Sequence, residues 1–315
     1  MTNLSIIVPI YNERENINIL YNEITEVSKK LIKNKTISDY EIIFVNDGSR
    51  DGSREILKKI SEKDKQFKVI ELRKNFGQTP ALKAGFDNCN GDLIVTLDGD
   101  LQNDPKDIPK LIEKLNKGYD VVSGWRYKRK DSFFKKIASR MMNNLRYIVI
   151  GDYLHDYGCA LKIYKKECVK DLELFGELHR YITAYLFIKG YKIGEVPVNH
   201  RPRKFGKTKY KIFSNRGING ILDLFYLKFW STYSNRPLHF FGRLGIYQWF
   251  LAFIIIIEQI IKAFIIQKLT LGPLLMLAAV LGISGLLFII FGFLSEIVMR
   301  TYFADKTIYN IRKIY

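Results

Sequence analysis

Apolar and polar residues alternate in a regular series of segments up to about residue 235. Short β-branched runs predict buried strands at 5–9, 40–45, 67–72, 93–97 and 120–123. Between them, apolar residues recur three or four positions apart, as over residues 14–33, which predicts helices. Strands that alternate with helices in this way form a parallel sheet with helices on both faces. The predicted fold class is therefore α/β, with a doubly wound, mostly parallel sheet.

Two long apolar stretches follow, at about 244–266 and 271–298. Each exceeds the roughly 20 helical residues that cross a hydrocarbon core of about 30 Å. Neither has a polar face, which favours two transmembrane helices over a buried hairpin. Basic residues flank the outer ends and only Lys268 lies between the stretches, so the positive-inside rule puts both ends in the cytoplasm. The expectation is a multi-pass protein of the cell (inner or plasma) membrane with a cytoplasmic N-terminal domain.

This hydropathy divides the chain into three parts. We expect a cytoplasmic domain at 1–211, an amphipathic interface segment at 212–240 and a membrane domain at 241–315. A further segment at 133–145 has apolar residues four apart with basic residues between them, which fits an interfacial helix or, equally, a core helix. The first residues lack a basic flank and Pro9 interrupts their apolar run, so no signal peptide is expected.

Composition narrows the partners. The 315 residues carry a formal net charge of +18, and the densest basic patch is 201–211, shortly before the apolar stretches. A polybasic segment there gains about 1 kcal/mol per charge from anionic lipid. A membrane surface is therefore the expected partner and nucleic acid is not, because no nucleic-acid module motif is present. Three cysteines without a Cys-x-x-Cys pair predict free thiols.

Three acids follow the predicted strand at 93–97: Asp98, Asp100 and Asp104. Like charges so close together favour a cation, and Mg²⁺ typically takes one or two carboxylates plus substrate phosphates. The loop is therefore a candidate metal-diphosphate site. The alternative is a polar turn in which Asp104 caps a helix that begins near Pro105.

Other polar residues fall at the same edge of the predicted sheet. Tyr11, Asp47 and Arg126 each follow a strand, as Asp98 does, and ligands of open α/β sheets bind at this carboxyl edge. For Asp47 the alternative is an ordinary Asp-Gly turn with Ser53 capping the next helix. The first strand lacks the Gly-x-Gly-x-x-Gly turn of a dinucleotide site, which counts against a Rossmann dehydrogenase.

Seven motifs in order resemble the GT-A glycosyltransferases of family 2. They are Val8-Pro9-Ile10-Tyr11-Asn12-Glu13, Val45-Asn46-Asp47-Gly48-Ser49, Asn75-Phe76-Gly77-Gln78, Asp98-Gly99-Asp100-Leu101-Gln102-Asn103-Asp104-Pro105, Gly124-Trp125-Arg126, Asp156-Tyr157-Gly158-Cys159 and Phe205-Gly206-Lys207-Thr208-Lys209-Tyr210. Within the family the chain resembles the polyisoprenyl-phosphate glycosyltransferases, which include dolichyl-phosphate mannose synthase and bacterial undecaprenyl-phosphate glucosyl and aminoarabinose transferases. The resemblance runs from about residue 4 to the paired C-terminal spans.

The resemblance implies a hexosyl- or pentosyltransferase that moves a sugar from a UDP- or GDP-linked donor to polyisoprenyl (undecaprenyl) phosphate, for cell-envelope glycosylation. It also implies roles at the matching positions. The residues that would contact the nucleotide sugar are Pro9, Tyr11, Glu13, Asp47 and Asp98, and those that would bind a Mg²⁺ or Mn²⁺ ion are Asp98 and Asp100. The catalytic positions would be Asp100, Gln102, Asp104 and Asp156. The phosphate or the acceptor would be contacted by Arg126, Ser139, Arg201, Arg203 and Lys209. Thr208 and Lys162 stand where many relatives have Ser and Arg, which leaves the donor open.

Asp156 matches the acid that lies near the acceptor in the family, and this match suggests that it acts as a general base. A phosphate monoester with a second pKa of about 6 is already largely dianionic at pH 7, so it needs none. We therefore expect Asp156 to position the acceptor or its cationic partners, and direct attack to invert the anomeric centre. The rival classes are a processive polysaccharide synthase, whose extra spans and Gln-x-x-Arg-Trp signature are missing, and a non-catalytic scaffold.

Glu258 and Lys262, four apart in the first span, fit a helical ion pair, and homo-oligomerisation stays open.

Overall fold

The computed structural model describes residues 2–127, 146–170, 178–205, 216–234, 236–266 and 272–303, together with Asn144, Leu172, Leu174 and Gly176. The chain divides into two compact units, Met1–Leu224 and Phe225–Tyr315. We describe each unit by itself. The interface role predicted for 212–240 stays a prediction, and the helix predicted at 133–145 lies outside the described residues apart from Asn144.

A seven-stranded sheet forms the centre of the first unit, in the order β3-β2-β1-β4-β6-β5-β7. The strands are β1 (Asn3–Ile10), β2 (Asp39–Asn46), β3 (Phe67–Glu71), β4 (Leu93–Thr96), β5 (Val121–Trp125), β6 (Lys162–Lys165) and β7 (Ile193–Pro197). All neighbours are parallel except β6, which runs antiparallel to both β4 and β5. The expected mostly parallel α/β sheet is confirmed, whereas β6 and β7 were not predicted.

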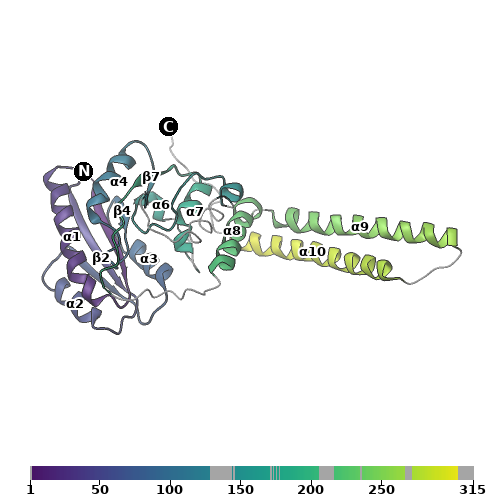
Figure 1. Cartoon of the computed structure of the whole chain (residues 1–315), viewed down its shortest axis with the longest axis horizontal. Coiled ribbons are helices and arrows are strands. Elements are labelled where there is room, and N and C mark those ends of the chain that lie inside the picture. The colour runs from purple at the N-terminus through teal and green to yellow at the C-terminus, as the bar shows by residue number, and fades with distance from the viewer. Residues whose placement is uncertain are drawn as a thin grey trace. The chain divides into compact units, whose positions relative to one another are not determined.

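Helices cover both faces of this sheet (Figure 1). On one face lie α1 (Arg14–Lys33), α2 (Ser53–Ser61) and α4 (Ile108–Asn116), and on the other lie α3 (Gln78–Asp87), α6 (Lys166–Lys170) and α7 (Ile182–Ile188). Successive side chains of a strand point to opposite faces. Accordingly Ile6 of β1 packs in the core that includes Leu20 of α1, while its neighbour Ile7 packs in the core that includes Phe86 of α3.

The two predicted helix caps had different outcomes. Asp104 caps the short helix η1 (Pro105–Asp107), since its side chain accepts a hydrogen bond of 3.0 Å from the Lys106 N–H. The prediction for Ser53 was wrong, because Gly52, at φ +88°, is the residue before α2. The Ser53 hydroxyl instead donates to Asp51 at 2.6 Å and accepts from the Glu13 N–H at 3.2 Å.

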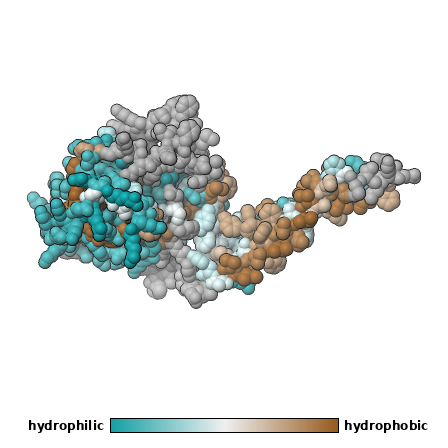
Figure 2. All heavy atoms as spheres, turned by 90° about the horizontal axis from the view of Figure 1, so that it is seen from below, coloured by the Kyte–Doolittle hydropathy of each residue, from teal (hydrophilic) through white to brown (hydrophobic). Residues whose placement is uncertain are grey.

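The second unit contains the helical hairpin of α9 (Pro237–Ile266) and α10 (Pro273–Phe303), preceded by α8 (Arg216–Tyr233), which begins in the first unit. Both hairpin helices are long and apolar enough to cross a membrane. Their outward side chains are mainly apolar (Figure 2). α9 contains the first predicted apolar stretch, and α10 contains the second from Pro273 onward.

Small residues bring the two hairpin helices together. A Cβ on Gly245 would lie 2.5 Å from the carbonyl oxygen of Gly285, so only glycine permits this backbone approach. The indole Nε1 of Trp249 donates to the Gly282 carbonyl at 2.9 Å, and the Ser284 hydroxyl donates to Gln248 at 2.9 Å. Polar groups that face the partner helix are thus paired within the hairpin.

Candidate active site

A pocket of about 290 Å³ opens where β1, β2 and β4 end. Because these strands are parallel, the residues that follow them meet at one edge of the sheet. The pocket is lined by seven of the residues predicted from the sequence: Pro9, Tyr11, Glu13, Asp47, Asp98, Asp100 and Arg203. The donor half of the predicted site is therefore gathered in one cavity.

Asp47 directly follows β2 and holds the loop that leads into α3. Its carboxylate accepts hydrogen bonds from the backbone N–H groups of Phe76 at 2.7 Å and Gly77 at 2.9 Å, and from the Asn75 amide at 3.0 Å. Burial raises the pKa of Asp47, and the two N–H groups oppose this. Gly48 makes the approach possible, since it has φ +67° and a Cβ there would lie 2.5 Å from the Lys74 carbonyl carbon.

The two acids assigned to the metal follow β4. Burial and the charge of Asp100 raise the pKa of Asp98 to about 6, opposed by the charges of Lys162 and Arg126. One oxygen of Asp98 accepts from the Gln78 amide at 2.8 Å. The charge of Asp100 disfavours the ionised form of Asp98, and a divalent cation beside both acids would relieve that repulsion. No group of three or more metal-ligating side chains occurs among the described residues, so a cation here needs ligands from the substrate.

Arg203 approaches these acids from the loop after β7. Its guanidinium donates to Asp100 at 2.7 Å and approaches Glu13 at 3.5 Å. The Nε of Arg203 is buried and has no hydrogen-bond partner within the described part of the chain. A cationic group already lies against Asp100, which shows that this position accommodates positive charge.

Three other predicted residues do not line the pocket. Asp104 caps η1 and forms an ion pair of 2.6 Å with Arg201, which also contacts Glu23 at 2.8 Å. The Gln102 backbone N–H donates to Asp100 at 3.1 Å, and its carbonyl accepts from the Arg201 N–H at 2.9 Å. These contacts give Asp104 and Arg201 partners within the protein, and their sugar and phosphate contacts stay predictions.

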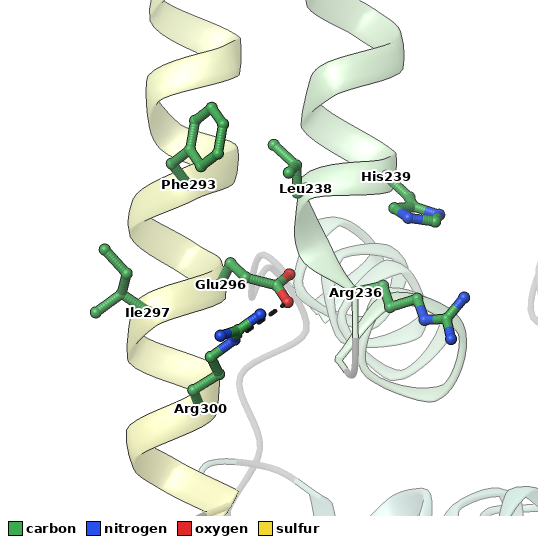
Figure 3. Close-up of a pocket in the computed structure, with 7 residues that line it drawn as sticks. All are labelled: Arg236, Leu238, His239, Phe293, Glu296, Ile297 and Arg300. Carbon is green, nitrogen blue, oxygen red and sulfur yellow. Dashed lines mark ion pairs between the residues drawn. The ribbon is translucent and has the colours of Figure 1, made fainter.

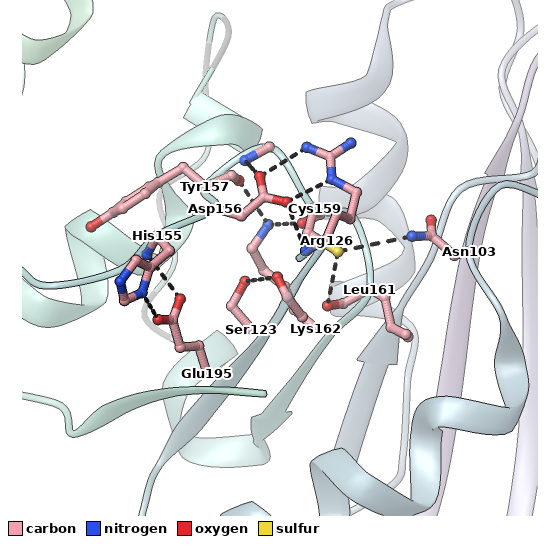
Figure 4. A network of polar contacts seen from close by, with 12 residues as sticks. Asn103, Ser123, Arg126, His155, Asp156, Tyr157, Cys159, Leu161, Lys162 and Glu195 are labelled. Carbon is pink, nitrogen blue, oxygen red and sulfur yellow. Dashed lines mark hydrogen bonds and ion pairs between the residues drawn. The ribbon is translucent and has the colours of Figure 1, made fainter. Parts of the chain in front are cut away.

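Arg126 and Asp156 form a second group of polar side chains at the same edge (Figure 4). Asp156 accepts two hydrogen bonds from the Arg126 guanidinium, at 2.6 and 2.8 Å, and two from the backbone N–H groups of Arg126 and Gly158, at 3.2 and 3.1 Å. Burial raises the pKa of Asp156, but Arg126 outweighs this effect and holds it below its usual value. A carboxylate so occupied is a poor proton acceptor.

Lys162 lies beneath this pair, at the first position of β6 (Figure 4). Because β6 is antiparallel, its amino end lies at the edge where the parallel strands end, and Lys162 pairs with Thr96 of β4. The ammonium donates to the carbonyls of Tyr157 and Cys159. Burial lowers the pKa of Lys162. The lysine therefore supplies an interior cation near Asp98, although the sequence marked it only as a departure from the family.

The pocket also contains residues that were not among the predicted site residues. Gln78, in the first turn of α3, contacts Asp98, and His179 of η2 (Leu178–Arg180) lines the same cavity. Nδ1 of His179 lies 2.7 Å from the Thr79 hydroxyl. Burial, with the charges of Arg180 and Lys162, lowers the pKa of His179 to about 3, so its ring is neutral. A lone histidine carried no sequence signal, whereas Gln78 belonged to a recognised motif.

Some predictions fall outside the described residues. Ser139, Thr208 and Lys209 lie there, so their roles stay predictions. Cys89, Cys159 and Cys168 are free thiols, as predicted. Glu258 and Lys262 form the predicted ion pair, at 2.6 Å.

Comparisons with known proteins identify the family and the fold. The family model described as glycosyl transferase family 2 matches residues 5–173. The chain is 39% identical, over 99% of its length and 93% of the relative's, to a dodecaprenyl-phosphate galacturonate synthase of Rhizobium johnstonii. Glucosyl-3-phosphoglycerate synthase of Mycobacterium tuberculosis, solved with Mn²⁺, UDP-glucose and phosphoglyceric acid, covers 72% of this chain and 80% of its own at TM-score 0.55 and 16% identity. The complex of the same enzyme with UDP has a TM-score of 0.54 at the same coverage and identity. These likenesses confirm the expected fold.

Proposed function

Because the chain belongs to glycosyl transferase family 2, we propose that it transfers a sugar from a nucleotide-sugar donor to the phosphate of a polyprenyl lipid. The observation that carries this proposal is the relative that is 39% identical over 99% of the chain, a span that includes both apolar C-terminal helices. That relative's name specifies a dodecaprenyl-phosphate product. The pocket at the carboxyl edge supplies groups suited to the donor.

The donor is proposed to occupy the pocket lined by Tyr11, Asp47, Asp98 and His179. Carboxylates at a strand end can accept from the hydroxyls of a ribose, and a neutral imidazole adds no charge to the sugar site. Asp47 holds the 75–77 loop through three hydrogen bonds, so it shapes the wall of this pocket as well as lining it.

Asp98 and Asp100 are proposed to hold a divalent cation, Mg²⁺ or Mn²⁺, with the donor diphosphate. When bound, such an ion neutralises charge on the leaving diphosphate. The fit rests on the raised pKa of Asp98 beside Asp100 and on the guanidinium that already lies against Asp100. Arg203, which contacts Asp100 at 2.7 Å, would be placed to donate to a phosphate oxygen of the donor.

The acceptor is proposed to approach from the side of Arg126. Its phosphate oxygen attacks the anomeric carbon, the bond from that carbon to the diphosphate oxygen breaks, and the nucleoside diphosphate leaves with the electron pair. The acceptor oxygen is already ionised at pH 7, so no base is required. Asp156 keeps Arg126 oriented through three hydrogen bonds, and attack opposite the leaving group inverts the anomeric centre.

The membrane placement is also part of the proposal. A polyprenyl chain is insoluble in water, so its phosphate must be met at a bilayer surface. The two apolar helices would anchor the chain with both ends on the cytoplasmic side, because the flanking residues Arg236, Arg243 and Arg300 lie at the ends away from the short connection.

The experiment is a transfer assay with the full chain in membranes. Membranes with and without the protein receive a panel of labelled UDP- and GDP-sugars, uronic acids included, together with undecaprenyl phosphate, and the lipid product is identified by mass spectrometry. A lipid-phosphate sugar formed from one donor supports the proposal. Donor hydrolysis without any lipid product from the whole panel contradicts it.

A further inference from the structure

The hairpin has a pocket at the end where α9 begins and α10 ends. Its volume is about 380 Å³, and it combines basic and apolar side chains (Figure 3). Arg236 and His239 come from the start of α9 and Arg300 from the last turns of α10, over a lining that includes Leu238 and Phe293. This mixture matches a phosphate headgroup joined to a hydrocarbon chain.

One carboxylate in the pocket moderates its charge. Glu296 lies 3.7 Å from the Nε of Arg300, at the far limit of an ion pair, and the Arg300 side chain is 81% exposed. Glu296 and Arg300 both extend from α10 toward α9 (Figure 3). Exposed pairs of this kind contribute little, so an incoming phosphate can replace Glu296 as the partner of Arg300.

A second hollow lies further along the same hairpin. It has a volume of about 440 Å³ and an apolar lining that includes Trp249, Ala252, Ala279 and Gly282. Small residues open this groove, because Ala279 and Gly282 leave the surface between larger neighbours unfilled. Its lining offers nothing to a headgroup and fits a hydrocarbon chain.

The two hollows lie on one face of the hairpin. Each α10 residue of the first pocket stands eighteen positions after one of the second, as Arg300 does after Gly282 and Ile297 after Ala279. Eighteen residues make five turns at about 3.6 residues per turn, so these residues face the same way. The rise of about 1.5 Å per residue separates the hollows by about 27 Å along the helix.

This separation indicates which kind of lipid can occupy both hollows. A chain confined to one leaflet reaches about 15 Å, half of a hydrocarbon core of about 30 Å. A phospholipid whose headgroup sat at Arg300 would therefore end well before Ala279, whereas a polyprenyl chain of eleven or twelve units is several times longer than a fatty-acyl chain. We infer that this face of the hairpin binds the long-chain polyprenyl phosphate itself, with its phosphate at Arg236, His239 and Arg300 and its chain along the face into the groove at Ala279.

This inference rests on the proposed function for the identity of the lipid, and it adds a lipid site formed by the membrane unit alone. It is tested with the full-length protein in nanodiscs of zwitterionic lipid. The probe is an undecaprenyl phosphate with a photoreactive diazirine at the far end of its chain, and crosslinked peptides are mapped by mass spectrometry. A farnesyl phosphate with the same diazirine serves as the short-chain probe.

The long probe is expected to label α10 around Leu275–Gly282, and the short probe to label nearer Phe293. Arg300→Gln should reduce both labels about tenfold, because a charge-assisted hydrogen bond is lost. Glu296→Gln should increase them about threefold, since it removes a competing charge. Ala279→Phe, which fills the groove at an exposed position, should reduce only the long-probe label.

Arg243→Gln is the matched control, because Arg243 is an exposed arginine of α9 that does not line the pocket. Its labelling should equal that of the unmodified chain. The inference is overturned if Arg300→Gln leaves the labelling unchanged. It is also overturned if excess phosphatidylglycerol removes the label as effectively as unlabelled undecaprenyl phosphate does. Sugar transfer measured in parallel without light separates the two proposals: absent transfer contradicts the proposed function, and intact transfer without hairpin labelling contradicts only the lipid site.

Discussion

Asp156→Asn separates a positioning role from base catalysis. The substitution replaces a carboxylate that accepts from Arg126 at 2.6 and 2.8 Å, while the two side chains are only 12% and 13% exposed. An amide keeps one acceptor oxygen and turns an NH₂ group toward the guanidinium. Arg126 is then left buried with half of its partner and none of the compensating charge.

The cost follows from that geometry. Removing one member of a buried ion pair lowers the free energy of unfolding by about 3–5 kcal/mol, and we expect about 3 kcal/mol because the amide oxygen still accepts. The pKa of Asp156 lies below its usual value, so its stabilisation is present above the unfolded pKa of about 4 and is lost as the pH falls toward the folded value. The difference in Tm between the two proteins should therefore stay nearly constant from about pH 7 to about pH 5 and shrink as the pH falls below about 4.

The catalytic readout is transfer to a polyprenyl phosphate at saturating donor. Asp156→Asn should retain a measurable rate, and raising the pH from about 7 to about 9 should not restore it, because the acceptor is already dianionic. Asp120→Asn is the matched control, since Asp120 pairs with Lys165 at 2.7 Å near the opposite, amino end of β5. It should lose stability and keep its kcat. No detectable transfer by Asp156→Asn, with donor and lipid binding intact, would refute the positioning account in favour of general-base catalysis.

Three further outcomes are expected. Asp100→Asn should abolish transfer while the fold persists by circular dichroism, and EDTA should have the same effect; full turnover in EDTA would exclude the metal assignment. Because the pKa of Asp98 is raised to about 6, its ionised form is lost as the pH falls through that value, so Mn²⁺ affinity measured by titration with donor present should decline below about pH 6 and stay level above about pH 7. Gly85→Ala should lower the free energy of unfolding by about 1–3 kcal/mol in urea, since a Cβ there lies 2.4 Å from Cγ2 of Ile7; an unchanged midpoint would show that the two residues adjust freely.

The sequence predicted β1 to β5 because most of these strands are buried on both faces and read as apolar runs. β6 escaped prediction because its four residues, Lys-Ile-Tyr-Lys, have lysines at both ends and form no apolar run. Periodicity also says nothing about strand direction, on which the position of Lys162 depends. A residue at the start of a strand reaches the functional edge only when the strand is antiparallel to its neighbours.

The site was predictable where a residue follows its strand closely. Asp47 comes directly after β2, Asp98 and Asp100 come two and four residues after the end of β4, and all three line the pocket. The partners of the arginines were not predictable, because the contact of Arg203 with Asp100 joins residues 103 positions apart. His179 is similar, since a hundred residues separate it from Thr79, and only the folded chain brings them together.

The direction of β6 has a further consequence for how such enzymes diversify. The chain leaves the sheet after Trp125 and returns at Lys162 in β6, which is the neighbour of β5. The two ends of the intervening segment therefore lie close together, and the ion pair of Arg126 and Asp156 joins them. Closing a longer loop costs little more than closing a shorter one, so the length of this excursion can change at little entropic cost. Recognition of the lipid and recognition of the sugar would then evolve on separate stretches of chain. Replacing residues 127–155 by the corresponding segment of a relative becomes a way to change the lipid acceptor while the sugar donor stays the same.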